Sequence, residues 1–189
     1  MGEHKRLMSV GKMSEWRTPK FVFDALGLVF DLDPCWPTSG PCFVPAREHY
    51  TVHDNGLVKP WHGLVWLNPP FGGRRSQVPW LKKFFHYGNG IALANALTSA
   101  DWFHQHVVPN AQVLCFPNGK TKFVRPDGSI GKEPGNGIVL MGAGDVANDA
   151  LRRSGLGVCM TVDRAPDRIC EDANTSLQEE IAGVVNNLG

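Results

Sequence analysis

Alternating apolar and polar stretches divide this chain into short strands and helices. Compact apolar runs predict buried strands, and apolar residues that recur every three or four positions predict amphipathic helices. The expected strands cover residues 30–35, 64–67, 91–97, 112–116, 118–125, 137–141 and 157–162. The expected helices cover residues 20–29, 78–85, 98–107, 145–153 and 176–188. Strands that alternate with helices in this way favour an α/β fold with a largely parallel sheet.

The length of 189 residues suits one domain with a sizeable core. Residues 1–14 lack periodicity and predict a flexible tail. The domain is expected over residues 15–144, with residues 145–189 forming a C-terminal extension packed on it. The last expected helix carries an apolar stripe, which would bury against the domain or, alternatively, against a second copy. The oligomeric state is left open.

Composition and charge narrow the class of protein. A formal net charge of +1 makes no global case for nucleic acid, so any DNA contact must come from a local patch. The apolar runs are far shorter than a membrane span, and the first residues contain no stretch like a secretory signal. Five cysteines, an odd number, suit reduced thiols. These features predict a cytoplasmic protein without membrane contact.

The residues Asn68-Pro69-Pro70-Phe71 follow the buried strand 64–67 directly. Two prolines must end the strand, because neither donates to a sheet ladder. In an open α/β sheet, ligands bind beyond the carboxyl ends of strands. The Asn68 amide oxygen and the Pro69 carbonyl can accept from an exocyclic amino group, and the Phe71 ring can stack on a base swung out of a helix. The tetrapeptide contains no efficient base, which fits methyl transfer from a sulfonium donor.

Asn-Pro-Pro-Phe resembles the catalytic motif of amino methyltransferases that use S-adenosylmethionine. The surrounding pattern resembles the phage-type DNA N6-adenine methyltransferases. The resemblance rests on Trp16-Arg17-Thr18-Pro19, on Asp31-Leu32-Asp33-Pro34-Cys35 and on Trp102-Phe103-His104. It extends from about Trp16 to Met141. It implies a Rossmann-like methyltransferase fold with a central, largely parallel sheet flanked by helices.

The resemblance also implies the site. The catalytic residues would be Asn68, Pro69, Pro70 and Phe71, and the donor site would contain Trp16, Thr18, Pro19, Asp33, Pro34, Cys35 and Asp54. From the residues alone, Thr18 is also an ordinary helix N-cap with Pro19 as first helical residue, and Asp54 also fits an Asx turn. The glycine-rich loop of most methyltransferases is replaced here by residues 36–41, so how the donor's methionine end is held stays open.

Two basic clusters are candidates for contacts with DNA phosphates. Arg74 and Arg75 follow the tetrapeptide in a glycine-containing loop. Lys120, Lys122 and Arg125 lie two or three residues apart, so at least two of them would share one face of the expected strand 118–125. A solvated loop or face explains either cluster equally well. Lys82 and Lys83 are expected to face solvent or DNA.

A spaced series of possible metal ligands, Cys35, Cys42, His49 and His53, offers a metal site as an alternative interpretation. Structural zinc sites usually space their cysteines two to four residues apart, as this series does not. No metal is therefore expected.

The sequence predicts a DNA adenine N6-methyltransferase that uses S-adenosylmethionine and acts on double-stranded DNA, in the host cytoplasm if phage-encoded. The same fold and motif also serve cytosine N4, RNA bases and protein amides. A catalytically silent DNA-binding relative is a further alternative. The sequence does not distinguish protection, as in restriction-modification, from regulation.

Overall fold

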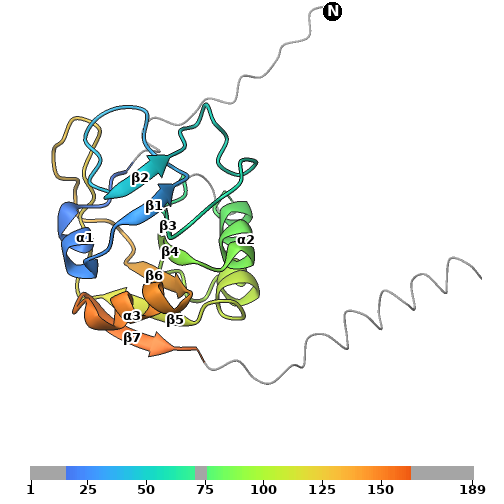
Figure 1. Ribbon diagram of the computed structural model, residues 1–189. Coiled ribbons are helices and arrows are strands. Elements are labelled where there is room, and N and C mark those ends of the chain that lie inside the picture. Colours follow the sequence, from blue (N-terminus) through green and yellow to red (C-terminus); the bar gives the residue numbers. More distant parts are fainter. Residues whose placement is uncertain (1–15, 71–75, 163–189) are drawn as a thin grey trace, which may run out of the picture.

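A computed structural model of the protein describes residues 16–70 and 76–162 (Figure 1). Its centre is a seven-stranded sheet in the order β2-β1-β3-β4-β6-β5-β7. The strands are β1 (Phe30–Asp33), β2 (Ala46–His49), β3 (Val65–Leu67), β4 (Gly90–Asn95), β5 (Val113–Pro117), β6 (Ile138–Ala143) and β7 (Gly157–Thr161). The helices are α1 (Lys20–Leu26), α2 (Val78–Tyr87), the π-helical turn η1 (Phe103–Val107) and α3 (Asp145–Arg153).

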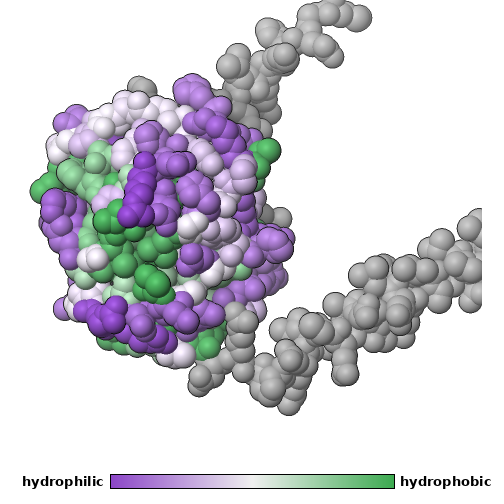
Figure 2. All heavy atoms as spheres, in the orientation of Figure 1, coloured by the Kyte–Doolittle hydropathy of each residue, from purple (hydrophilic) through white to green (hydrophobic). Residues whose placement is uncertain are grey.

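Two apolar layers cover the sheet, one on each face. Side chains of α1 and α3 pack on one face, where the fully buried Trp66 ring lies 4.8 Å from the Phe23 ring and 5.5 Å from the Phe30 ring. Side chains of α2 and η1, including Leu81 and Phe103, pack on the other. Figure 2 shows the outer surface as mostly hydrophilic, with an apolar area between the positions of α1 and α3. The sheet is thus buried from both sides, as an α/β fold requires.

The strands do not all run in one direction. β2, β1, β3 and β4 pair in parallel, whereas the β4–β6, β6–β5 and β5–β7 pairs are antiparallel. Because β6 is antiparallel to both β4 and β5, strand β5 runs in the same direction as β4. The expectation of a largely parallel sheet is therefore correct for five strands and wrong for β6 and β7. The physical reason lies in the connection from β5 to β6, residues 118–137, which contains no helix. A parallel return requires a crossover, usually a helix, and without it β6 runs back antiparallel.

Most elements expected from periodicity are confirmed, with shifted ends. The polar edge strand β2 was missed, because an exposed edge shows no apolar alternation. The expected strand 118–125 is wrong: among these residues Val124 alone forms bridges, one to Arg17 and one to Ile130. The expected tail 1–14 and helix 176–188 lie outside the described residues. Within residues 16–70 and 76–162, no helix is long and apolar enough to cross a membrane.

The described part of the expected extension, residues 145–162, contains α3 and β7. Helix α3 packs on β6 and β5, and β7 pairs with β5 along its full length. Described residues 145–162 therefore complete the same sheet that carries the rest of the domain.

Lys83 ties α2 to the loop that leads into β3. Its ammonium group donates to the carbonyl oxygens of Gly56, Leu57 and Lys59 at 3.0, 2.9 and 2.5 Å, and it lies 4.8 Å from the centre of the Trp61 ring. Partial burial lowers the pKa of Lys83. The expectation that Lys83 faces solvent or DNA is therefore wrong, because three loop carbonyls and a ring hold it in place.

We expect Lys83→Met to lower the free energy of unfolding by about 1–3 kcal/mol, because hydrogen bonds from a charged group to three carbonyls are lost. The exposed neighbour provides the control, since Lys82→Met should change that free energy by less than about 0.5 kcal/mol. Urea denaturation followed by tryptophan fluorescence measures both. Equal effects of the two substitutions would contradict the role of Lys83.

Candidate active site

A cavity of about 410 Å³ opens where β1 and β3 end. The two strands are parallel neighbours, so their carboxyl ends meet at one edge of the sheet. The wall is built from residues 16–18, 33–37 and 68–70, from Thr51, Val52, Asn55 and Gly56, and from Cys42, Val44, Trp66 and Trp80. The cavity therefore combines segments that are up to 64 positions apart in the sequence, from residue 16 to residue 80.

Eight residues predicted from the sequence meet in this wall. They are Trp16, Thr18, Asp33, Pro34, Cys35, Asn68, Pro69 and Pro70. Pro19 is buried at the start of α1 and lies outside the wall. Phe71, Arg74 and Arg75 lie outside the described residues, so their predicted roles stay predictions.

The Asn68 side chain is oriented by the segment that precedes α1. Its amide nitrogen donates to the Trp16 carbonyl at 3.2 Å and lies 3.4 Å from the Thr18 hydroxyl oxygen. The amide oxygen Oδ1 is buried and has no hydrogen-bond partner among the described residues. Because a buried acceptor without a partner is unfavourable, this oxygen is a site for a donor from a ligand.

Thr18 differs from its simplest expectation. Pro19 occupies the N-cap position of α1, and no side chain caps the helix. The buried Thr18 hydroxyl lies instead against the Asn68 amide. Thr18 therefore orients Asn68, a role that the local sequence alone did not reveal.

Asp33 places a buried carboxyl group in the wall. It is 3% exposed, and one oxygen accepts a hydrogen bond of 2.8 Å from the backbone N–H of Cys35. Burial raises the pKa of Asp33 to about 7, although the Cys35 N–H opposes that shift. The carboxyl group is therefore partly ionised near neutral pH and gains from a cationic ligand.

The thiols in the wall stay protonated. Burial raises the pKa of Cys35 well above its ordinary value and that of Cys42 to about 11. His49, the third member of the sequence series, stacks on Trp36 with ring centres 4.5 Å apart. Among residues 16–70 and 76–162, no group of three or more potential ligand side chains gathers around a metal position.

Asp54 is held in a turn beside the cavity. Its carboxylate accepts from Lys59 at 2.7 Å and from the backbone N–H and hydroxyl of Thr51, both at 2.9 Å. The Lys59 hydrogen bond, followed by those from Thr51, holds the pKa of Asp54 well below its usual range. Asn55 and Gly56 line the cavity, whereas Asp54 does not. Contact between Asp54 and a donor stays a prediction.

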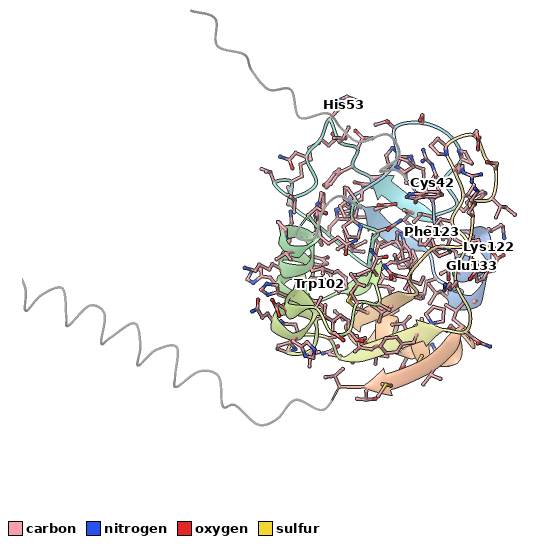
Figure 3. The ribbon with its side chains drawn as sticks, turned by 180° about the vertical axis from the view of Figure 1, so that it is seen from behind. Cys42, His53, Trp102, Lys122, Phe123 and Glu133 are labelled. Carbon is pink, nitrogen blue, oxygen red and sulfur yellow. The ribbon has the colours of Figure 1, made fainter. Side chains whose placement is uncertain are left out.

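The basic residues after β5 are not on a strand. Lys120 lies 3.4 Å from Glu133, and the Arg125 guanidinium donates to the Ser129 hydroxyl and the Ile130 carbonyl, both at 3.0 Å. Lys122 is exposed, and Figure 3 shows it on the same side of the molecule as Cys42 and Glu133, away from Trp102. Lys120 and Arg125, two of the three residues predicted to contact phosphate, therefore form interactions within their own loop.

Several wall residues were not predicted from the sequence. Trp66 on β3 and Trp80 in the first turn of α2 both line the cavity. The helical spacing of Trp80 had indicated an ordinary core residue. Arg17 lies between the two predicted residues Trp16 and Thr18 and is 3% exposed. Its position inside the motif Trp16-Arg17-Thr18-Pro19 was the sequence signal that could have identified Arg17 as a wall residue.

Comparison with protein-family models gives one match that covers most of the chain. The model described as DNA N-6-adenine-methyltransferase (Dam) matches residues 8–141. Comparisons with curated proteins and with solved structures give no match. The matched range contains β1 to β5 and all the wall residues, and it confirms the resemblance drawn from the motifs. The chain therefore belongs to the DNA N-6-adenine-methyltransferase (Dam) family.

Proposed function

We propose that this protein transfers a methyl group from S-adenosylmethionine to the exocyclic N6 amine of an adenine flipped out of double-stranded DNA. The observation that carries the proposal is the Asn68 amide, whose nitrogen faces two oxygen atoms while its buried oxygen has no partner among the described residues. Membership of the family supports the substrate class. We place the activity in the cytoplasm, where DNA is accessible.

The size and chemistry of the cavity support S-adenosylmethionine as the donor. Cofactor sites usually measure roughly 300–1,000 Å³, and this one measures about 410 Å³. Trp36 and Trp80 supply aromatic surface for a purine ring. The buried Asp33 carboxyl suits a ligand that carries positive charge. S-adenosylmethionine, when bound, would supply an electrophilic methyl group on a sulfonium.

The residues of the chain would position the acceptor amine. Asn68 Oδ1 accepts one N–H of the amine and the Pro69 carbonyl accepts the other, which directs the nitrogen lone pair away from both oxygens. Phe71 is proposed to stack on the flipped base. In the proposed transfer, the nitrogen–methyl bond would form as the sulfur–methyl bond of the donor breaks, and the amine would release one proton to solvent. Asn68 itself neither gains nor loses a proton.

We expect Asn68→Ala to lower the rate of methyl transfer by roughly 100-fold or more, because the oriented acceptor oxygen is lost. Donor affinity should change by no more than a few-fold. Transfer of labelled methyl to unmethylated DNA, followed by digestion to nucleosides, measures the rate and identifies the product. Asn136→Ala, in an exposed loop, is the matched control and should keep full activity.

The same assay separates the alternatives. Label in N6-methyladenosine would support the proposal. Label in N4-methylcytosine would instead identify the N4 amine of cytosine as the acceptor. No label in DNA with intact donor binding would direct the search to RNA or protein amides. Absence of donor binding in folded wild-type protein would favour the alternative of a catalytically silent DNA-binding relative.

We expect Asp33→Asn to stabilise the free protein above neutral pH and to weaken donor binding. The folded-state pKa of Asp33 is raised to about 7 from 3.8, so its penalty is absent below about pH 4 and complete above about pH 7. Removing the charge should raise the free energy of unfolding by roughly 2–4 kcal/mol at pH 8 and have little effect at pH 4.

Urea denaturation at the two pH values tests the stability effect, and calorimetric titration with S-adenosylmethionine at pH 8 tests the binding effect. Equal stability of the two proteins at both pH values would refute the buried ionisable state of Asp33. Unchanged donor affinity would remove Asp33 from the donor site.

A further inference from the structure

Cys115 on β5 and Cys159 on β7 lie directly opposite each other in the antiparallel pair at the edge of the sheet (Figure 1). Both side chains belong to the apolar layer on the α3 side, where Cys115 is fully buried and Cys159 is half-buried. The Cys159 thiol donates a hydrogen bond of 3.2 Å to the Leu151 carbonyl oxygen. Neither cysteine lines the active-site cavity, so the proposed methyl transfer leaves both thiols without a role.

The hydrogen-bond pattern defines the spacing of this pair. Hydrogen-bonded and non-hydrogen-bonded pairs alternate along an antiparallel ladder. At the end of the pairing the Asn118 N–H donates to the Leu156 carbonyl at 2.8 Å, and the Cys115–Cys159 pair lies three positions back from it. The two cysteines therefore form a non-hydrogen-bonded pair. Pro117, two positions after Cys115, fits the same assignment, because a residue without an N–H loses no ladder bond there.

A non-hydrogen-bonded pair has the spacing that a disulfide needs. The Cα atoms of such pairs are about 4.5 Å apart, and disulfides join residues whose Cα atoms are roughly 4.4–6.8 Å apart. Directly opposite residues also share one face of the sheet. A hydrogen bond between the thiols is, after burial, the next cause of the raised pKa of Cys115, which places the two sulfur atoms in contact. The two strands therefore hold the thiols where a bond can form.

We propose that Cys115 and Cys159 form a redox-active dithiol, which a small disulfide such as oxidised glutathione converts to a disulfide bond. This inference is independent of the proposed function. A reducing compartment would keep the pair reduced, because cytosolic disulfides are usually transient. The bond would tie the edge strand β7 to β5 and close the segment 115–159, which contains β6 and α3. It would therefore stabilise the part of the sheet that has a neighbour on one side alone.

The difference in burial sets the order of the two exchange steps. Burial raises the pKa of Cys115 to about 12, so its thiolate is scarce and it does not start the reaction. The partly exposed Cys159 attacks one sulfur of oxidised glutathione as a thiolate and forms a mixed disulfide. The sulfur–sulfur bond of the oxidant breaks, and the released glutathione thiolate takes up the proton that Cys159 lost.

Cys115 completes the exchange from its position beside the mixed disulfide. Its sulfur attacks the Cys159 sulfur, and the second glutathione leaves with the Cys115 proton. The proximity of the two sulfur atoms offsets the high pKa of Cys115 in this step. The two protein thiols lose two electrons and two protons, and one glutathione disulfide becomes two glutathione thiols.

Peptide mapping of the full chain tests the inference. Trypsin places Cys115 in the peptide 84–120 and Cys159 in the peptide 154–164, so a linked pair is identified by its mass. Folded protein is incubated with oxidised glutathione, free thiols are blocked by alkylation, and the digest is analysed before and after addition of dithiothreitol. Cys170→Ser is the matched control, since Cys170 lies outside the described residues and belongs to neither the pair nor the cavity wall.

We expect the linked peptides 84–120 and 154–164 as the main product, and dithiothreitol should release them. Cys115→Ser should stop at a mixed disulfide on Cys159, whereas Cys159→Ser should leave the buried Cys115 unmodified. If the serine variant of Cys115 does not fold, Cys115→Ala repeats the test without a hydroxyl in the core. Oxidation should raise the melting temperature of the wild-type protein and of Cys170→Ser by roughly 5–15 °C.

Three results would overturn the inference. The first is folded wild-type protein without the linked peptides, whether Cys159 stays free or carries glutathione. The second is a link that forms in urea and not in the folded protein. The third is an oxidised protein that melts no higher than the reduced one, because the pair would then not be preformed. Methyl transfer enters none of these measurements, so the proposed function stands or falls separately.

Discussion

The parallel pairing of β1 with β3 is the constraint on which the site depends. Leu32 lies opposite Val65, so Asp33 and Asn68 leave the sheet at the same edge. The Asp31 carboxylate fixes this register by accepting the Leu64 N–H at 2.7 Å, and the Asp31 N–H donates to the Leu64 carbonyl at 2.8 Å. The Leu64 hydrogen bond is also the main cause of the lowered pKa of Asp31. A slip of one residue in this pairing would turn the side chains of β3 to the opposite face of the sheet.

The register alone does not orient Asn68; a second, distant contact does so. Residues 16–18 run beside Val124 in the long connection between β5 and β6. Gly131 in that connection lies so close to Trp16 that a Cβ atom there would be 2.7 Å from the indole ring. The connection 118–137, which contains the basic residues predicted to contact phosphate, therefore also packs against residues 16–18, which contact the Asn68 amide. A change in this loop acts on the site through Trp16 and Thr18.

Local patterns predicted much of the fold and part of the site. Buried strands such as β4 and helices such as α2 follow from periodicity, because each buries a defined face. The strand directions, the edge strand β2 and the role of Lys83 depend on contacts distant in sequence, which no local pattern encodes. The motif around Asn68 identified the catalytic segment, since its residue types are tied to chemistry. The Thr18 contact and the position of Arg17 required the folded arrangement.

The cavity also concentrates groups that the fold leaves unsatisfied. Trp66 Nε1 and Asn68 Oδ1 are buried without a hydrogen-bond partner among the described residues, and both residues line the wall. Each such group costs about 1–3 kcal/mol, and the buried Asp33 carboxyl adds a charge penalty above neutral pH. Orphaned atoms are not by themselves evidence of function, since the buried Oδ1 of Asn148, on α3 and outside the wall, also lacks a hydrogen-bond partner among the described residues. What distinguishes the cavity is that a donor, an acceptor and an acid occur together, so a ligand with complementary groups relieves all three at once. Hydrogen bonds and charge from a bound ligand would offset the free-energy cost of these groups, so their cost in the free protein would contribute to binding.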